Sequence, residues 1–267
     1  MSEDLRRFLD EDVGAGDVTT ALTVPPGEAR ATVFCEEDAV VAGVEEAVGV
    51  FGLMGVECEV FIDDGGNANK GDAVMGVRGR MAAILTCERT ALNFLMRMSG
   101  IATATSLATK LCAPTKVAGT RKTTPGFRKY EKRAIELGGG LAHRHGLYDA
   151  VLIKDNHIKA AGGLAAAMDA AMDAPYAMSV QVEAETLVDA VTAAKMGADS
   201  ILVDNLPPSR IAEIRDAVKA IDPDITVEAS GGVDLDNVAS YSGVADVVSM
   251  GSLTHSARAV HFSLDLD

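Results

Sequence analysis

The sequence predicts an α/β fold in which a barrel of parallel strands follows a smaller α+β unit. From about Lys116 onward, short apolar β-branched runs alternate with Ala-rich amphipathic segments, and the later runs recur at roughly 20 to 25 residues. Strand–helix units of this length imply a parallel sheet with right-handed crossovers. Polar residues stand at the carboxyl ends of these runs, where βα barrels build their active sites, so a barrel is favoured over an open sheet.

The first ~100 residues have a different texture, typical of an α+β unit. A helix is expected over residues 3–11, and strands are expected over residues 29–35 and 56–62, separated by Gly/Asp/Asn turns. A long helix is expected over residues 81–99, because apolar residues at helical spacing continue with few breakers until Gly100.

The barrel strands and their connecting helices can be placed individually. The predicted strands are residues 116–119, 150–154, 179–183, 200–204, 226–230 and 245–250. Helix boundaries are marked by Pro207-Pro208-Ser209 before one helix and by Gly197 after another. Lys154, Glu183 and Asp204 end three strands, and all three are expected at one mouth.

Composition excludes several classes of function. The formal net charge is −15, aromatic residues are 4% and Trp is absent, so a nucleic-acid-binding protein is not expected. Neither a signal peptide nor a membrane-spanning run is visible, and a cytoplasmic location without membrane contact is expected. The cysteines are more than 20 residues apart and predict reduced thiols rather than a zinc site or disulfides: Cys35, Cys58, Cys87 and Cys112.

Residues 110–133 reverse the acidic charge of the chain, with 8 of its 24 basic residues. Arg121 and Lys122 follow a predicted strand and are flanked by hydroxyl side chains, which suits a ligand with several negative charges. The basic residues at positions 128–133 are instead predicted to form a solvated helix face. His143, Arg144 and Lys154 are expected to join Arg121 and Lys122 on a cationic side of the mouth.

The other side of the mouth is predicted to be acidic and phosphate-binding. Ser230-Gly231-Gly232 and Gly251-Ser252-Leu253 follow the last two strands, and each is expected to open a helix whose amides bind phosphate. Glu183 and Asp204 are predicted to act as acid and base or to hold Mg²⁺; the alternative for each is pairing with a nearby lysine. His143 and His145 are not expected to bind metal, because Arg144 between them would repel a cation.

Several motifs together resemble the quinolinate phosphoribosyltransferase family, also called nicotinate-nucleotide pyrophosphorylase (carboxylating). The motifs are ERTALN (88–93), TRKTTPG (120–126), GGGLAHR (138–144) and LIKDNH (152–157). The likeness extends from EDVGAGD (11–17) to GSLTHS (251–256). Three positions depart from the usual family pattern: Gly119, Ala142 and Gln181, the last of which stands where an acid is frequent.

The resemblance implies an α/β sandwich domain over residues 1–104 and an incomplete α/β barrel over 105–257, with residues 258–267 packing on the first domain. It implies transfer of phosphoribosyl from 5-phosphoribosyl-1-pyrophosphate to quinolinate with loss of CO₂, assisted by Mg²⁺. It also implies a homodimer or larger homo-oligomer in which each active site is completed by the neighbouring subunit. The alternatives are a related phosphoribosyltransferase acting on nicotinate or another small ring acid, or a non-catalytic anion-binding paralogue.

The resemblance also implies a role for each candidate residue. Substrate-binding residues would be Arg89 from the neighbouring subunit, Thr120, Arg121, Lys122, His143, Arg144, Lys154, Glu183 and Asp204. Of these, Lys122, Glu183 and Asp204 would be catalytic, with Lys122 near the pyrophosphate and the two acids near the ribose and Mg²⁺. The loops Ser230-Gly231-Gly232 and Gly251-Ser252-Leu253 would hold the 5-phosphate.

Overall fold

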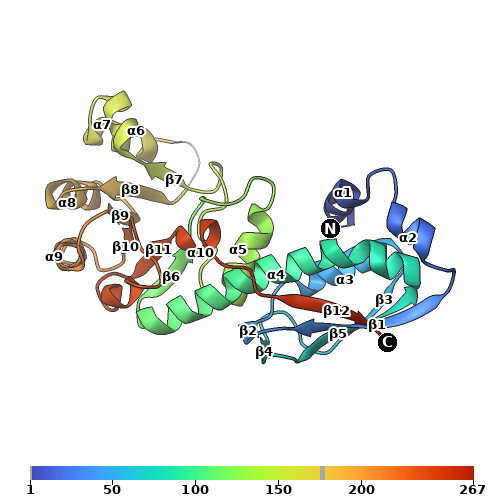
Figure 1. Ribbon diagram of the computed structural model, residues 1–267. Coiled ribbons are helices and arrows are strands. Elements are labelled where there is room, and N and C mark those ends of the chain that lie inside the picture. The colour runs from blue at the N-terminus through green and yellow to red at the C-terminus, as the bar shows by residue number, and fades with distance from the viewer. Residues whose placement is uncertain (1, 175–177) are drawn as a thin grey trace. The chain divides into compact units, whose positions relative to one another are not determined.

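The computed structural model describes residues 2–174 and 178–267, which form two compact units (Figure 1). The first unit runs to Ala104 and includes Glu136–Gly138 and the C-terminal residues Ala257–Asp267. The second unit comprises Thr105–Ile135 and Gly139–Ser256. The C-terminal segment therefore belongs to the same unit as the N-terminus.

The first unit is built on an antiparallel sheet with the strand order β12-β1-β5-β3. Its strands are β1 (Glu28–Cys35), β3 (Glu57–Val60), β5 (Ala73–Arg80) and β12 (Phe262–Leu266), and a small pair is formed by β2 (Ala39–Val40) and β4 (Asn67–Ala68). The last strand of the chain pairs with the first. Ala31, Val33 and Cys35 alternate along β1 on its buried face, as a half-buried strand requires.

Helices lie beside this sheet in the first unit (Figure 1). They are α1 (Ser2–Val13), α2 (Val18–Thr23), α3 (Val44–Leu53) and the start of α4 (Met81–Cys112). All but α2, whose Val18 and Leu22 are exposed, bury apolar residues there. Leu5 of α1 is fully buried and packs against Gly49 of α3 so closely that a Cβ there would lie 2.4 Å from its Cδ1. The predicted helix and strands of this unit are confirmed, with ends shifted by a few residues.

Gly100 does not end the long helix, contrary to the sequence-based expectation. Helix α4 is 32 residues long and continues through Gly100 to Cys112, two residues before Pro114. Gly100 instead allows the C-terminal segment to approach, because a Cβ at this position would lie 2.1 Å from the carbonyl oxygen of Arg258. The amide of Val260 donates to the Met96 carbonyl at 3.0 Å and fixes that approach.

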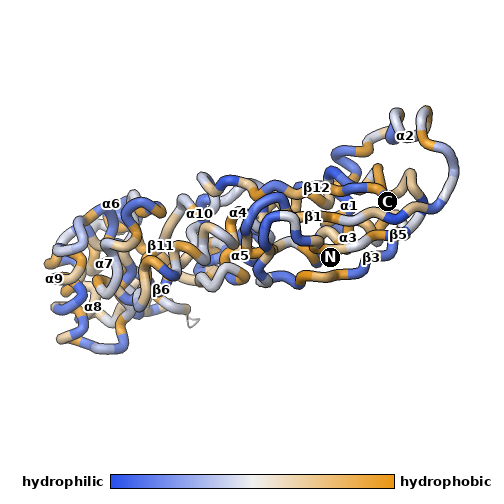
Figure 2. The backbone as a smooth tube through the Cα atoms, turned by 60° about the horizontal axis from the view of Figure 1, so that its bottom comes forward, coloured by the Kyte–Doolittle hydropathy of each residue, from blue (hydrophilic) through white to orange (hydrophobic). Residues whose placement is uncertain are grey.

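In the second unit a parallel six-stranded sheet has the order β6-β11-β10-β9-β8-β7. The strands are β6 (Lys116–Gly119), β7 (Val151–Ile153), β8 (Val180–Ala184), β9 (Ser200–Asp204), β10 (Thr226–Ser230) and β11 (Val247–Met250). Every predicted barrel strand is confirmed, and three have the predicted bounds. Within the described residues β6 and β7 do not pair with each other, so the barrel is incomplete. Strand β11 is buried at every position, and Figure 2 colours it as hydrophobic.

Helices connect these strands and start at recognisable signals. They are α5 (Arg128–Leu137), α6 (Asp155–Ala161), α7 (Leu164–Met172), α8 (Leu187–Lys195), α9 (Pro208–Lys219), the 3₁₀ turn η1 (Val238–Tyr241) and α10 (Ser252–His255). The α8 amide of Asp189 donates to the Thr186 side chain at 3.1 Å, and Pro208 occupies the first turn of α9. One expectation is wrong: Ser230-Gly231-Gly232 leads into a loop, and the next helical turn begins only at Val238.

Among the described helices, none combines the length and apolar character needed to cross a membrane.

Substitution of Gly100 by alanine tests the role assigned to this glycine. The added methyl group meets the Arg258 carbonyl, so we expect a loss of about 1–3 kcal/mol in unfolding free energy. Gly52→Ala is the matched control, because the space around Gly52 is open and alanine favours a helix. Urea denaturation measures both variants, and equal stability of the two would contradict the packing role of Gly100.

Candidate active site

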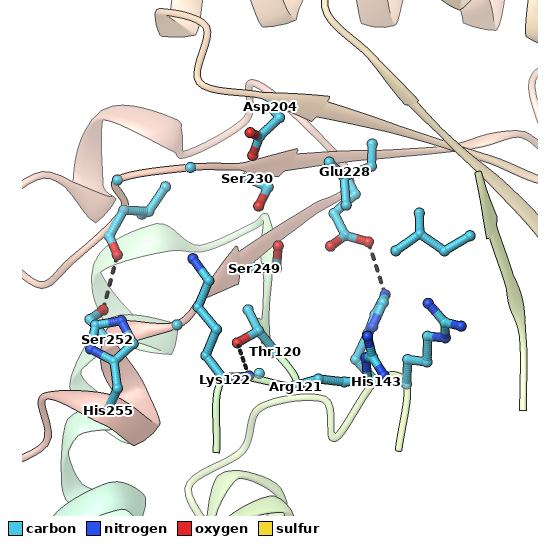
Figure 3. A pocket seen from close by; sticks show the side chains of 18 of the residues that line it. Thr120, Arg121, Lys122, His143, Asp204, Glu228, Ser230, Ser249, Ser252 and His255 are labelled. Atoms are coloured by element: carbon cyan, nitrogen blue, oxygen red, sulfur yellow. Dashed lines mark hydrogen bonds and ion pairs between the residues drawn. The ribbon is translucent and has the colours of Figure 1, made fainter. Parts of the chain in front are cut away.

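A cavity of the second unit lies at the carboxyl ends of the parallel strands and measures about 670 Å³ (Figure 3). Because side chains alternate along each strand, the inward-facing residues form two layers. The rim layer includes Thr120, Lys154, Asp204, Ser230 and Gly251, and the floor layer includes Leu152, Gln181, Leu202, Glu228 and Ser249. The rim is therefore polar, as the strand ends predicted, but so is much of the floor.

The structure brings most of the predicted site residues to this cavity. Those that line it are Thr120, Arg121, Lys122, His143, Arg144, Lys154, Asp204, Ser230, Gly231, Gly232, Gly251 and Ser252. Three predicted residues do not line it: Arg89, Glu183 and Leu253. Arg89 lies on α4 in the first unit, where 58% of its side chain is exposed. Leu253 is buried, so only its backbone is available to a ligand.

Glu183 and Lys154 form an ion pair between neighbouring strands β8 and β7. The Glu183 side chain is only 10% exposed, whereas Lys154 remains 45% exposed and reaches the cavity. For Glu183 the structure thus shows the alternative expected from the sequence, a carboxylate paired with lysine. Asp204 is the carboxylate of the predicted acidic pair that faces the cavity, and it accepts a hydrogen bond from Asn205 Nδ2 at 2.5 Å.

Arg121 and Arg144 bring two positive charges to the same wall of the cavity. Burial lowers the pKa of the Arg144 guanidinium, and the nearby charge of Arg121 lowers it further. Asp149 compensates weakly, with its Oδ1 3.8 Å from Arg144 Nε. That buried Nε has no hydrogen-bond partner in the described part of the chain. A buried cationic donor without a hydrogen bond, beside a second cation, favours an anionic ligand.

The two Gly-rich loops approach the cavity from the last strands. Gly231 has a φ of +93°, and a Cβ there would lie 2.2 Å from Asn205 Oδ1, so only glycine fits this turn. Ser252 opens α10 and donates its hydroxyl hydrogen to the Val233 carbonyl at 2.9 Å, which ties the second loop to the first. Lys122 passes directly over Gly251, where a Cβ would lie 3.0 Å from its Cδ (Figure 3).

Glu228 is the most important site residue that the sequence analysis did not identify. Its carboxylate lies on the floor with 3% side-chain exposure, 2.9 Å from His143 Nε2 and 2.8 Å from the Gln181 amide nitrogen. Burial alone would raise the pKa of Glu228, but hydrogen bonding and charge from His143, together with Ser249 and Gln181, hold it below its usual value. The sequence signal was a lone acid within an apolar strand run.

The departure at Gln181 is explained by this floor network. Its amide donates to both Glu228 and the Ser200 hydroxyl, the latter at 3.1 Å. An acid at position 181 would place a second carboxylate within hydrogen-bonding distance of Glu228, where only one of the two could readily ionise. His255 also lines the cavity; it lies in the GSLTHS motif but was not predicted as a site residue.

The prediction of a solvated basic face over residues 128–133 is wrong for Lys132. This lysine is fully buried, and its ammonium donates hydrogen bonds to the main-chain carbonyls of Ala142 and Gly119. Glu131 is also fully buried and accepts from the Thr124 amide and hydroxyl, both at 3.0 Å. Charged residues of α5 therefore form hydrogen bonds to the segments that contain the site residues. Lys129 of the same helix remains exposed.

The side chains around Asp204 could bind only a metal ion that takes most of its ligands from water and substrate. Among the described residues, no group of three or more His, Cys, Asp or Glu side chains could hold an ion. Mg²⁺ differs from zinc in that it commonly binds through one or two carboxylates, several waters and substrate phosphates. Asp204, with Glu183 on the adjacent strand, is compatible with that mode.

Comparison with known proteins identifies the family. The model for the N-terminal domain of quinolinate phosphoribosyl transferase matches residues 17–99, and the model for its C-terminal domain matches residues 101–265. The chain belongs to the quinolinate phosphoribosyl transferase family. The predicted resemblance is thereby confirmed over almost the whole length.

Relatives of this quinolinate phosphoribosyl transferase family member come from distant organisms. A probable nicotinate-nucleotide pyrophosphorylase (carboxylating) of Archaeoglobus fulgidus is 41% identical, with 93% of this chain and 97% of the relative aligned. The human nicotinate-nucleotide pyrophosphorylase (carboxylating) is 40% identical over 92% of this chain and 85% of its own. The structure of the Francisella tularensis nicotinate-nucleotide pyrophosphorylase superposes with a TM-score of 0.93 at 32% identity, covering 100% and 95% of the two chains.

Glu228→Gln tests the buried floor network. The substitution removes the charge that His143 and Gln181 stabilise, so we expect a loss of about 1–3 kcal/mol in unfolding free energy at pH 7. The folded-state pKa of Glu228 lies below the ordinary value of 4.5. The ionised carboxylate therefore stabilises the fold above pH 4.5, and this stabilisation disappears as the pH falls through the folded-state pKa. The difference between wild type and variant should therefore narrow below pH 4.5.

Urea denaturation across a pH series measures this difference, with the exposed Glu59→Gln as control. Equal unfolding free energies of wild type and Glu228→Gln at pH 7 would contradict the network. A difference between them that grows as the pH is lowered would contradict it as well.

Proposed function

We propose that this protein transfers phosphoribosyl from 5-phosphoribosyl-1-pyrophosphate to the ring nitrogen of quinolinate, releasing pyrophosphate. The 2-carboxylate then leaves as CO₂ and nicotinate mononucleotide is formed. The observation that carries the proposal is the cationic wall of Arg121 and Arg144, in which the buried Arg144 Nε has no hydrogen bond within the described residues. A dicarboxylate supplies two negative charges to two guanidinium groups that otherwise repel each other.

The cationic wall would bind and orient the pyridine dicarboxylate. Arg144 is only 11% exposed, so a carboxylate bound to it is partly shielded from water and the interaction is strengthened. His143 is held by Glu228 beside this wall and would fix one side of the ring. Orientation of the ring nitrogen toward the sugar carbon is the contribution expected of these residues, because correct placement lowers the entropic cost of the transfer.

The opposite side of the cavity would bind phosphoribosyl pyrophosphate. Backbone amides of the loops at Gly231 and Ser252 suit the 5-phosphate, and Lys122, which extends beside them, suits the pyrophosphate. Asp204 would stabilise positive charge that develops on the ribose as the pyrophosphate departs, and Glu183 would assist through its ion pair with Lys154. Mg²⁺ held near Asp204 and Glu183 would neutralise the charge of the leaving pyrophosphate.

The proposal includes a homo-oligomer and a cytoplasmic location. The exposed Arg89 supports the first, because the family resemblance assigns the matching arginine to the active site of a neighbouring subunit. The cysteines support the second: all four are free thiols, and burial raises the pKa of Cys58 to about 11 and that of Cys87 to about 12. Such thiols stay protonated and unreactive in a reducing compartment.

An assay of the purified protein with quinolinate, phosphoribosyl pyrophosphate and Mg²⁺ tests the activity. We expect pyrophosphate and CO₂ in equal amounts. Pyrophosphate release with nicotinate but not with quinolinate would support the related-phosphoribosyltransferase alternative. Binding of both ligands without any product would support the non-catalytic alternative.

Arg144→Ala separates the two sides of the cavity. Loss of a charge-assisted contact should weaken quinolinate binding roughly 10- to 100-fold. Phosphoribosyl pyrophosphate binding should change by less than about threefold, because its phosphates are assigned to the other wall. Isothermal titration calorimetry with each ligand makes the comparison, and Arg210→Ala on the outer helix α9 is the control. Equal weakening of both ligands would contradict the division of the cavity.

A further inference from the structure

Two cations on α5, Arg128 and Lys132, lie one helical turn apart and contact the same two chain segments. Arg128 donates from Nη1 to the His145 carbonyl at 2.9 Å and from Nη2 to the Arg121 carbonyl at 3.4 Å. Lys132 donates to the carbonyls of Ala142 and Gly119, the latter at 3.5 Å. Each cation thus links one carbonyl of the 119–124 segment to one carbonyl of the 142–145 segment.

These two links bracket the cationic wall of the cavity. The first segment carries Thr120 and Arg121, and the second carries His143 and Arg144. Lys132 holds the residue immediately before each pair, while Arg128 holds Arg121 itself and the residue after Arg144. Helix α5 therefore links the two arginine-bearing segments beyond the point where Gly119 N–H donates directly to the Leu141 carbonyl at 3.0 Å.

The link must act against electrostatic repulsion, because the charge of Arg121 disfavours the protonated form of Arg144. Lys132 is buried at a desolvation cost that its hydrogen bonds to main-chain carbonyls offset. A forked guanidinium reaches two carbonyls and a hydroxyl at once, since Arg128 Nε also donates to Thr123 Oγ1 at 2.8 Å. Methionine, which has a similar length but no N–H donor, could not make these bonds.

We propose that Arg128 and Lys132 are positioning residues that determine affinity for the dicarboxylate by fixing the distance between Arg121 and Arg144. The inference rests on the proposed function, because it takes quinolinate as the ligand of that wall. Neither residue touches the cavity, so neither is assigned a contact with substrate.

The effect should be selective for one substrate. Lys122 also lies in the 119–124 segment, but its carbonyl accepts a hydrogen bond at 2.7 Å from the hydroxyl of Thr254, which belongs to α10. Thr254 is fully buried and provides an anchor for Lys122 that does not depend on α5. Loss of Arg128 or Lys132 should therefore displace Arg121 and Arg144 more than Lys122.

Steady-state kinetics on Arg128→Met and Lys132→Met test the proposal. We expect KM for quinolinate to rise about tenfold or more, with KM for phosphoribosyl pyrophosphate changed by less than about threefold. Arg128→Lys, which keeps the charge but not the fork, should give an intermediate KM for quinolinate. Lys129→Met removes an exposed cation from the same helix and should leave all constants unchanged.

A merely structural role for the two cations would lower the affinity for both substrates together, and that result overturns the proposal. An unchanged KM for quinolinate in Arg128→Met overturns it as well. If Lys132→Met does not fold, Arg128→Met decides alone, because Arg128 is only half-buried.

Hydrogen–deuterium exchange separates this inference from the proposed function. In Arg128→Met, amide exchange in residues 119–121 and 142–145 should accelerate about tenfold relative to Lys129→Met, with or without activity. A wild-type protein inactive toward quinolinate would overturn the proposed function; unchanged exchange in Arg128→Met would overturn the positioning role.

Discussion

The repulsion between Arg121 and Arg144 is the constraint on which the rest of the cavity depends. Arg144 is nearly buried, its Nε makes no hydrogen bond within the described residues, and the neighbouring guanidinium makes its charged form less favourable. The chain carries a net charge of −15, and the two segments that bear these cations are held through hydrogen bonds to their main-chain carbonyls. Strand β6 and the isolated bridge at Leu141 bring the two segments to one rim, and α5 holds them from outside the cavity.

The floor of the cavity balances the charge of the rim. Glu228 lies below the cationic wall and binds His143, so one negative charge is buried where positive charge accumulates. Gln181 donates a further hydrogen bond to this carboxylate without adding a second charge. Asp204 remains accessible on the opposite side, beside loops whose glycine and serine backbones suit phosphate. Separation of these environments within one cavity allows two differently shaped anions to be held together.

The sequence predicted the strands and most of the rim but not the floor or the supports. Strand ends are visible because a polar residue follows an apolar run, as Asp204 follows residues 201–203. Glu228 was missed because a single acid inside a strand gives no sign of which face it occupies. Lys132 was assigned to a solvated face because its partners are carbonyls, which every residue has. Gly100 looked like a helix end, since local propensity cannot reveal that another segment packs there.

Recognition of a dicarboxylate by Arg121 and Arg144 is tested most directly by comparing two pyridine acids as ligands of the wild-type protein. Quinolinate carries two carboxylates, and nicotinate carries one at the equivalent ring position. If Arg121 and Arg144 together recognise a dicarboxylate, isothermal titration calorimetry should show quinolinate binding at least about tenfold more tightly, since a lost charge-assisted contact costs roughly 1.5–3 kcal/mol. Equal affinities for the two acids would contradict the central claim.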